Sequence, residues 1–363
     1  MTLKNHVKIW LLVLAITIVL LWLFKGILLP FVVGLALAYL LDPLADRLEK
    51  WKFNRLFATI IVIFFMILIF VGAAFLIVPL VASQVVGLLE KIPTYITQLQ
   101  LLFNQWLPEV NSYIGQERIA QIEDSLSSMF GQGLGVATNI LSSVMQSGLA
   151  VLNAFGLLVI TPVVAFYMLL DWDKMVAASD KLLPRKNRAE IRTVLKDIDK
   201  AMSGVVRGQS SVVLLLCIFY ATSLSLVGLN FGLAIGLISG LLSFIPYVGF
   251  LVGLLLSVGV ALVQFWPDWL MVTIILAIFM VGQFLEGNIL YPKLVGSNIG
   301  IHPVWLMFAL FASGFIFGFV GLLLAVPLVA IIGVLVRFAL SKYKVSELYL
   351  GEVKKTGGKT VKK

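Results

Sequence analysis

The sequence predicts an all-α, polytopic integral membrane protein with about eight transmembrane helices. Of the 363 residues, 61% are hydrophobic and 12% are charged, whereas about a quarter of the residues in soluble domains are charged. A water-soluble fold would lack the polar surface needed to cover so large an apolar core. The apolar runs are also continuous, without the ten-residue alternation of a β-barrel strand. Because backbone amides in hydrocarbon need internal partners, the runs should form helices.

Eight apolar runs account for the predicted spans. About twenty residues cross a bilayer, so the first two runs are short, while two runs of 33 residues would each form a straight helix about 50 Å long. Each overlong run contains a proline, Pro246 or Pro327, so we expect it to be kinked, broken or folded back as a re-entrant hairpin. The first run lacks a small-residue cleavage pattern and is interpreted as a retained span rather than a signal peptide. The runs are Ile9–Phe24, Ile27–Leu41, Leu56–Ala82, Val151–Leu170, Ser210–Leu229, Phe231–Val263, Trp269–Leu285 and Val304–Val336.

The distribution of basic residues orients the chain. With the N-terminus inside, all but four of the 27 lysine and arginine residues fall in the inner loops and the tail; the exceptions are Lys25, Lys91, Arg118 and Lys293. The positive-inside rule therefore predicts a multi-pass protein of the cell membrane with both termini in the cytoplasm. The net charge of +9 comes from the basic residues gathered in these inner loops and the tail. A basic inner face favours contact with anionic membrane lipid rather than with nucleic acid.

The polar stretches divide the chain into six parts. Helical periodicity with moderate polarity predicts an extracytoplasmic amphipathic segment on the membrane surface or against a neighbouring subunit, and a charged periodic stretch predicts a cytoplasmic helix joining two spans. The expected parts are 1–83 (three spans), 84–147 (amphipathic segment), 148–170 (one span), 171–207 (cytoplasmic helical segment), 208–340 (spans five to eight) and 341–363 (basic tail).

The chain contains no recognisable catalytic, metal or cofactor motif. His6 and His302 fall on opposite sides of the predicted membrane, and the single cysteine, Cys217, lies in an apolar run. No phosphate-binding loop or serine elbow is present. The sequence thus predicts no enzyme activity, no metal and no cofactor, and any transport would be driven by a gradient.

Helix-breaking residues recur in the two overlong runs. The segments 240–246 and 321–327 both fit the pattern Gly-Leu-Leu-x-x-[Ile/Val]-Pro. Interrupted helices expose backbone dipoles at the substrate sites of many transporters, so one hypothesis is a pair of broken helices flanking a pathway. The alternative is coincidence in a leucine-rich sequence. The candidate break points are Gly240, Pro246, Gly318, Gly321 and Pro327.

Polar residues at membrane depth are the other functional candidates, because burying them is costly. Glu286 is the only acidic residue between Asp268 and Glu347, and Gln283 shares its helix face. Glu286 could carry a proton or a cation; alternatively, it caps the span at the outer interface and pairs with Lys293. The candidates for the pathway or for contact with a small polar solute or monovalent cation are Arg207, Gln209, Pro246, Gly249, Gln283, Glu286 and Asn288. Arg207 could instead extend to the interface along its aliphatic stem.

At these residues the sequence resembles the autoinducer-2 exporter (AI-2E) family of bacterial membrane transporters. The family motifs occur in order over about residues 9–340, so the match covers nearly the whole chain. They are Tyr39-Leu40-Leu41-Asp42-Pro43, Pro162 with Phe166–Asp171, Arg207-Gly208-Gln209, Ile245–Gly249, Glu286-Gly287-Asn288 with Pro292 and Val295-Gly296, His302-Pro303, Phe317-Gly318 with Gly321, and Pro327-Leu328.

The resemblance implies eight spans, transport and a homo-oligomer, which is pentameric in some relatives. It implies the solute less firmly, because some relatives are similar to exporters of the quorum-sensing signal autoinducer-2 and others to Na⁺(Li⁺)/H⁺ antiporters. Three hypotheses follow: an exporter of a small polar solute such as autoinducer-2, a monovalent cation/proton antiporter using Glu286, and a non-transporting scaffold or sensor that binds partners through its polar segments.

Overall fold

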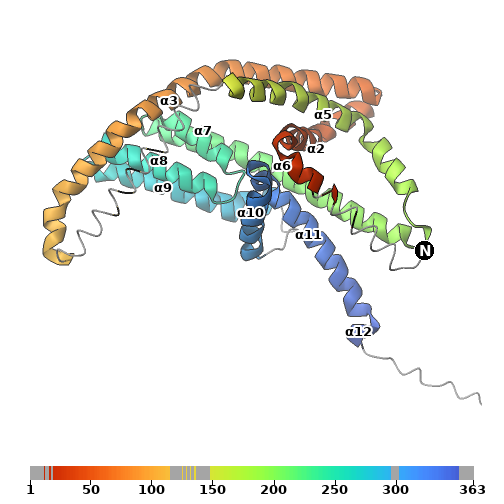
Figure 1. Ribbon diagram of the computed structural model, residues 1–363. Helices are drawn as coiled ribbons and strands as arrows, with labels where there is room; N and C mark the ends of the chain where they lie inside the picture. Colours follow the sequence, from red (N-terminus) through yellow and green to blue (C-terminus); the bar gives the residue numbers. More distant parts are fainter. Residues whose placement is uncertain are drawn as a thin grey trace, which may run out of the picture. The chain divides into compact units, whose positions relative to one another are not determined.

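The computed structural model is helical throughout the part of the chain that it describes. It describes residues 19–114, 148–295 and 302–350, together with Leu12, Ile16, Thr17, Ser125, Ser128, Gly131 and Gly135. Within these residues, six helices are long and apolar enough to cross a membrane, and three apolar helices are shorter. The predicted fold class, a polytopic all-α membrane protein, is confirmed (Figure 1).

The chain forms two compact units, and it passes between them three times. One unit contains Met1–Trp172 and Arg207–Val295, and the other contains Asp173–Val206 and Gly296–Lys363. Two long helices, α5 (Gly148–Lys181) and α6 (Arg188–Leu226), each contribute residues to both units.

In the first unit, α2, α3 and α5 share one apolar core. A short 3₁₀ turn, η1 (Lys25–Ile27), leads into α2 (Leu28–Lys50), which is followed by α3 (Arg55–Ile114). The core of these helices consists of Ala38, Leu41, Ala45, Val62, Ile63, Ala165 and Leu169. The predicted boundary near residue 84 is not a break, because α3 continues as one helix of 60 residues. The span and the first part of the amphipathic segment are therefore a single helix about 90 Å long.

The expected cytoplasmic helix between two spans is also part of longer helices. α5 runs on to Lys181, the chain turns through η2 (Arg185–Asn187), and α6 begins at Arg188 and continues to Leu226. Pro184 precedes the turn, where its ring disfavours a helical residue before it. Helix α6 contains the periodic residues 191–202 and continues into the predicted fifth span without a break. The segment 171–207 therefore has no separate helix of its own.

The first overlong run is split into two helices that pack against each other, α7 (Gly232–Leu242) and α8 (Val248–Gln264). Pro246 is in the break, where Tyr247 adopts a left-handed conformation with φ of 69°. Gly240, predicted as a break point, instead lies inside α7, where an added Cβ would overlap the backbone of Cys217. It is there because α7 packs closely on α6.

The chain continues into α9 (Trp269–Leu285) and a π-helical segment, η3 (Glu286–Val295). The Asp268 side chain caps α9 by accepting a hydrogen bond from the Leu270 amide at 3.0 Å. π-Helical turns are rare and frequently occur at functional sites. Both Glu286 and Pro292 belong to this one.

In the second unit the other overlong run is likewise split, into α10 (Pro303–Phe317) and α11 (Phe319–Val345), which pack against each other. The break is at Gly318, with φ 61° and ψ −137°. Gly321 and Pro327 lie inside α11, so they are not break points. Gly321 permits close packing, because a Cβ there would overlap the Ser313 carbonyl. α11 is followed by α12 (Glu347–Leu350).

Candidate transport site

The site begins with Gln209, a polar side chain in the interior of the first unit. Gln209 belongs to α6 and is only 1% exposed. Its Nε2 donates hydrogen bonds to the carbonyls of Ser243, at 3.0 Å, and Phe244, at 3.2 Å. These carbonyls lie where α7 ends, and the last carbonyls of a helix have no partner within it. Gln209 therefore holds the broken hairpin α7–α8 against α6.

Glu286 lies at the first position of η3 and is 6% exposed. Its carboxyl is close enough to the hydroxyls of Tyr220 and Tyr291 to interact electrostatically with both. Lys293 is exposed and forms no ion pair with Glu286. The ion pair between Glu286 and Lys293 in the alternative interpretation is therefore not formed between these two described residues.

Tyr291 connects these two parts of the site. Its side chain lies within interaction range of the Gln209 amide as well as of Glu286. Tyr220 is fully buried and stacks on Phe279, with ring centroids 4.8 Å apart. We call Gln209, Tyr220, Glu286 and Tyr291 the buried polar cluster; α6 and η3 supply its four side chains, and the α7–α8 break supplies the carbonyls that Gln209 binds.

Glycines allow the backbones around this cluster to approach one another. A Cβ at Gly208 would overlap the Leu294 carbonyl of η3, and one at Gly282 would overlap the Tyr220 hydroxyl. At Gly249, near the start of α8, a Cβ would overlap the backbone and side chain of Ser243. These contacts fix η3 and α9 in relation to α6, and α8 in relation to the end of α7.

The other predicted pathway residues lie around the cluster rather than in it. Pro246 and Gly249 are buried at the α7–α8 break, and Gln283 is half-buried on α9, one turn before Glu286. Asn288 is exposed, and its Nδ2 donates to the Phe284 carbonyl at 3.2 Å. Of the predicted residues, only Gln209 and Glu286 are joined in one site through Tyr291.

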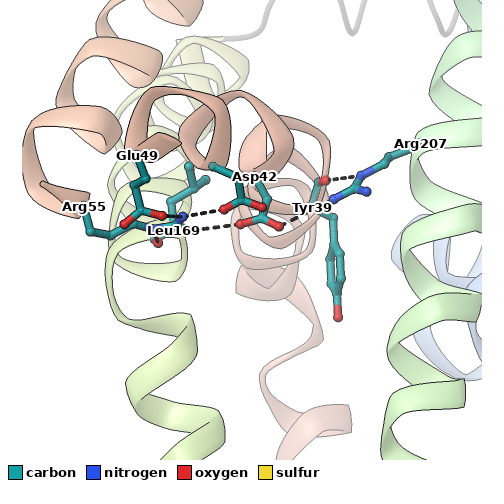
Figure 2. A network of polar contacts seen from close by, with 7 residues as sticks. Tyr39, Asp42, Glu49, Arg55, Leu169 and Arg207 are labelled. Atoms are coloured by element: carbon teal, nitrogen blue, oxygen red, sulfur yellow. Dashed lines mark hydrogen bonds and ion pairs between the residues drawn. The ribbon is translucent and has the colours of Figure 1, made fainter. Parts of the chain in front are cut away.

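A second polar network joins α2, α3 and α5 (Figure 2). Arg55 bonds three carboxylates: Asp42 at 2.8 Å, Asp46 at 2.7 Å and Glu49 at 3.0 Å. Its Nε donates to the Leu169 carbonyl of α5 at 2.9 Å, and Figure 1 shows α5 running beside α3. With a side chain only 17% exposed, Arg55 binds the three helices together at one point.

Arg207 belongs to this second network. Its Nε donates to the Tyr39 carbonyl at 2.7 Å, and its guanidinium is 3.6 Å from Asp42 (Figure 2). The Tyr39 carbonyl is four residues before Pro43, which has no N–H to bond it within the helix. Arg207 thus donates to a carbonyl that Pro43 cannot bond, and it anchors α6 to α2.

Sequence reasoning missed Tyr220 and Tyr291 in the first network and Arg55 in the second. A tyrosine in an apolar run gives no sign of whether its hydroxyl is buried, and Arg55 looks like one more basic residue of an inner loop. One signal was available: if the helix of the second span continues past Leu41, Pro43 has no N–H to bond the Tyr39 carbonyl, and a donor from elsewhere can take its place.

Comparison with known proteins identifies the family. The family model described as AI-2E family transporter matches residues 11–341. YrrI of Bacillus subtilis (strain 168), provisionally named as a transport protein, is 30% identical over 86% of this chain and 86% of its own length. YueF of the same organism, named in the same provisional way, is 29% identical over 84% of this chain and 81% of its own length.

A more distant relative is named for a solute. The AI-2 transport protein TqsA of Escherichia coli (strain K12) is 24% identical over 84% of each chain. The match to the family model spans both units described above, including the buried polar cluster and the Arg55 network. This chain is a multi-pass membrane protein that belongs to the AI-2E transporter family, and it is a transporter rather than an enzyme.

Proposed function

We propose that the protein is a gradient-driven exporter of a small polar solute, and that Glu286 couples export to proton movement. The observation that carries the proposal is the burial of Glu286 within electrostatic range of the Tyr220 and Tyr291 hydroxyls. An ionised carboxylate is costly at membrane depth. A carboxyl kept there can be neutralised by a proton in one state and release it in another.

The broken hairpin supplies the rest of the proposed site. Transporters bind solutes where discontinuous helices expose backbone groups in the membrane interior. Here Gln209 links the α7–α8 break to α6, and Tyr291 links Gln209 to Glu286. A solute bound at the break and a proton on Glu286 would therefore act on the same helices, which is a physical basis for coupling.

Autoinducer-2 is the first solute to test, because TqsA, a relative of this chain, is named as an AI-2 transport protein. The purified protein should be reconstituted in liposomes and given autoinducer-2 and a panel of small polar solutes, with and without a proton gradient. We expect gradient-dependent movement of at least one solute, and loss of its gradient dependence in Glu286→Gln. Glu90→Gln, which changes an exposed carboxylate on α3, is the matched control.

A cell assay complements the liposomes. Deleting the gene should raise the intracellular level of the signal and lower the extracellular level. An unchanged partition in the deletion strain, together with no solute movement in liposomes, would contradict export.

A monovalent cation/proton antiporter is the second candidate function. It is favoured by the chemistry of the buried polar cluster, which combines one carboxyl with an amide oxygen and two hydroxyls, since oxygen atoms are the ligands that hard cations prefer. Inverted vesicles would then show Na⁺- or Li⁺-induced recovery of a quenched pH dye, and Glu286→Gln would abolish it. Full activity in that variant would exclude Glu286 from the mechanism.

We further propose that the protein is a homo-oligomer in the cell membrane. Exposed apolar side chains extend along α3, from Phe64 and Phe65 to Phe75 and Leu76, and this surface can pack against either lipid or another copy. Cross-linking in native membranes followed by native mass spectrometry of the purified protein tests the assembly. A single monomeric mass in mild detergent, with no cross-linked species, would contradict it.

A further inference from the structure

Three oxygen atoms of the buried polar cluster are buried without a hydrogen bond of ordinary geometry. Among the described residues, neither Gln209 Oε1 nor the hydroxyls of Tyr220 and Tyr291 have such a partner. Buried polar groups in native proteins are almost always paired, and leaving one unpaired is costly. Three such atoms in one cluster with a buried carboxyl indicate that the site binds something from outside the chain.

The geometry of Gln209 fixes what its oxygen can do. Both carbonyls that it contacts, those of Ser243 and Phe244, accept from Nε2. Rotating the amide by half a turn would bring Oε1 against two carbonyl oxygens, which repel it. The Gln209 oxygen is therefore held in one direction, and it can only accept a hydrogen bond.

The rest of the cluster offers acceptors and hydroxyls but no positive charge. Glu286 is an acceptor when it is ionised, and the two tyrosine hydroxyls can donate or accept. The nearby basic residues are directed elsewhere: Arg207 is bonded to the Tyr39 carbonyl and Lys293 is exposed. An anionic solute would therefore meet a carboxyl and an amide oxygen with no compensating cation.

We propose that Gln209 and Tyr291 form a binding subsite that recognises hydroxyl groups of an uncharged solute. The Gln209 oxygen accepts a hydrogen bond from a solute hydroxyl, and the Tyr291 hydroxyl bonds the same or the neighbouring hydroxyl of the solute. Gln209 is then a specificity-determining residue, because a solute without a donor leaves its oxygen unpaired. This inference rests on the proposed transport function and names the residues that select the solute.

Such a subsite discriminates sharply against analogues. A site built to bond a hydroxyl rejects the analogue that lacks it by several orders of magnitude, since the buried polar group of the site is then left without a partner. Removing the Tyr291 hydroxyl while retaining its ring should weaken binding of a polyol without disturbing the packing of η3.

Direct binding tests the proposal without relying on transport. The full chain in nanodiscs should be examined by saturation-transfer difference NMR with erythritol as the uncharged polyol, erythronate as its anionic counterpart, and LiCl or NaCl as competitors. We expect binding of erythritol and not of erythronate, and at least tenfold weaker erythritol binding in Tyr291→Phe and Gln209→Met. Tyr167→Phe, at an exposed position on α5, is the matched control and should bind normally.

Each contrary result has a defined meaning. The proposed subsite would be overturned if the protein does not bind erythritol, if it binds erythronate equally well, or if binding is unchanged in Tyr291→Phe. It would also be overturned if Li⁺ or Na⁺ displaces erythritol from the wild type at concentrations that leave erythritol binding to Tyr291→Phe unchanged. Tyr291→Phe keeps the test valid if Gln209→Met does not fold, which size-exclusion chromatography would reveal.

The same preparation separates this inference from the proposed function. Glu286→Gln should still bind erythritol but should lose gradient-driven movement in liposomes. If wild-type protein binds erythritol through Tyr291 yet no gradient drives its movement, the proposed function fails and the subsite remains. If transport is gradient-driven but Tyr291→Phe binds like wild type, only the subsite is refuted.

Discussion

Arg207 shows how one side chain can replace a hydrogen bond that the sequence removes. Pro43 has no N–H to donate to the Tyr39 carbonyl four residues before it in α2, and the Nε of Arg207 donates to that carbonyl from α6 at 2.7 Å. An unpaired carbonyl in a membrane helix is costly, and groups on neighbouring helices commonly bond carbonyls that prolines leave free. The proline and the arginine are thus two parts of one contact.

This pairing makes a prediction for a double-mutant cycle. In the wild type, Arg207→Met should destabilise the protein by on the order of 2 kcal/mol, the usual value for a hydrogen bond from a charged group. In a Pro43→Ala background the alanine N–H bonds the Tyr39 carbonyl within α2, so Arg207→Met should cost less. Thermal unfolding in detergent measures both costs, and equal values in the two backgrounds would show that the proline and arginine are independent.

Arg55 predicts a different response because it has many partners. Arg55→Met leaves Asp42, Asp46 and Glu49 close together without their shared cation, and it also frees the Leu169 carbonyl. Asp46→Asn removes only one ion pair, at an aspartate whose side chain is 52% exposed, and exposed pairs contribute about 0–1 kcal/mol. Unfolding temperatures should therefore fall by several degrees in Arg55→Met and hardly at all in Asp46→Asn.

At the scale of elements, the two overlong runs show what helix breakers mean in a membrane. The sequence paired Pro246 with Pro327, yet only Pro246 lies in a break, and the second break is at Gly318. Pro327 removes one backbone hydrogen bond, which helix packing tolerates. Gly318 has φ 61° with ψ −137°, a conformation that residues with a Cβ strongly avoid.

The sequence could predict only those residues of the site whose role is visible without the tertiary structure. A lone acid in an apolar stretch is visible in one dimension, so the sequence offers Glu286 as a candidate, and it also offers Gln209, two residues after Arg207. Tyr220 and Tyr291 were not, because their hydroxyls become significant only when tertiary packing brings them beside Glu286. The helices were predictable from hydrophobic length, whereas the continuity of α3 and α6 past the expected boundaries was not, because amphipathic and apolar segments share one helical period.

The position of the α10–α11 break predicts different losses of stability for two substitutions in the second unit. Gly318→Ala forces a side chain into the left-handed region at the α10–α11 turn and should cost about 1–3 kcal/mol. Pro327→Ala should leave α11 intact, because the helix is already continuous there. Thermal unfolding in detergent compares the two variants, and a larger loss in Pro327→Ala would contradict this account of the break.

At the scale of the whole molecule, the distribution of charge is the evidence for the proposed orientation in the membrane. The two units are joined through α5, α6 and the segment after Val295. The turn between α5 and α6 is strongly basic, and Arg188 and Arg192 there bind Asp180 at 2.5 Å. By the positive-inside rule this turn should be cytoplasmic and Lys293 should be on the opposite side.

Cysteine labelling tests that orientation with few changes, because Cys217 is the only cysteine and is buried. In a Cys217→Ala background, a cysteine substituted for exposed Lys181 should react with a membrane-impermeant maleimide only in inverted vesicles. One substituted for exposed Lys293 should react in intact cells, and Cys217→Ala alone should not react. Labelling of the Lys181 position in intact cells would reverse the proposed orientation. Labelling of both positions from one side would mean that the chain crosses the membrane an even number of times between them.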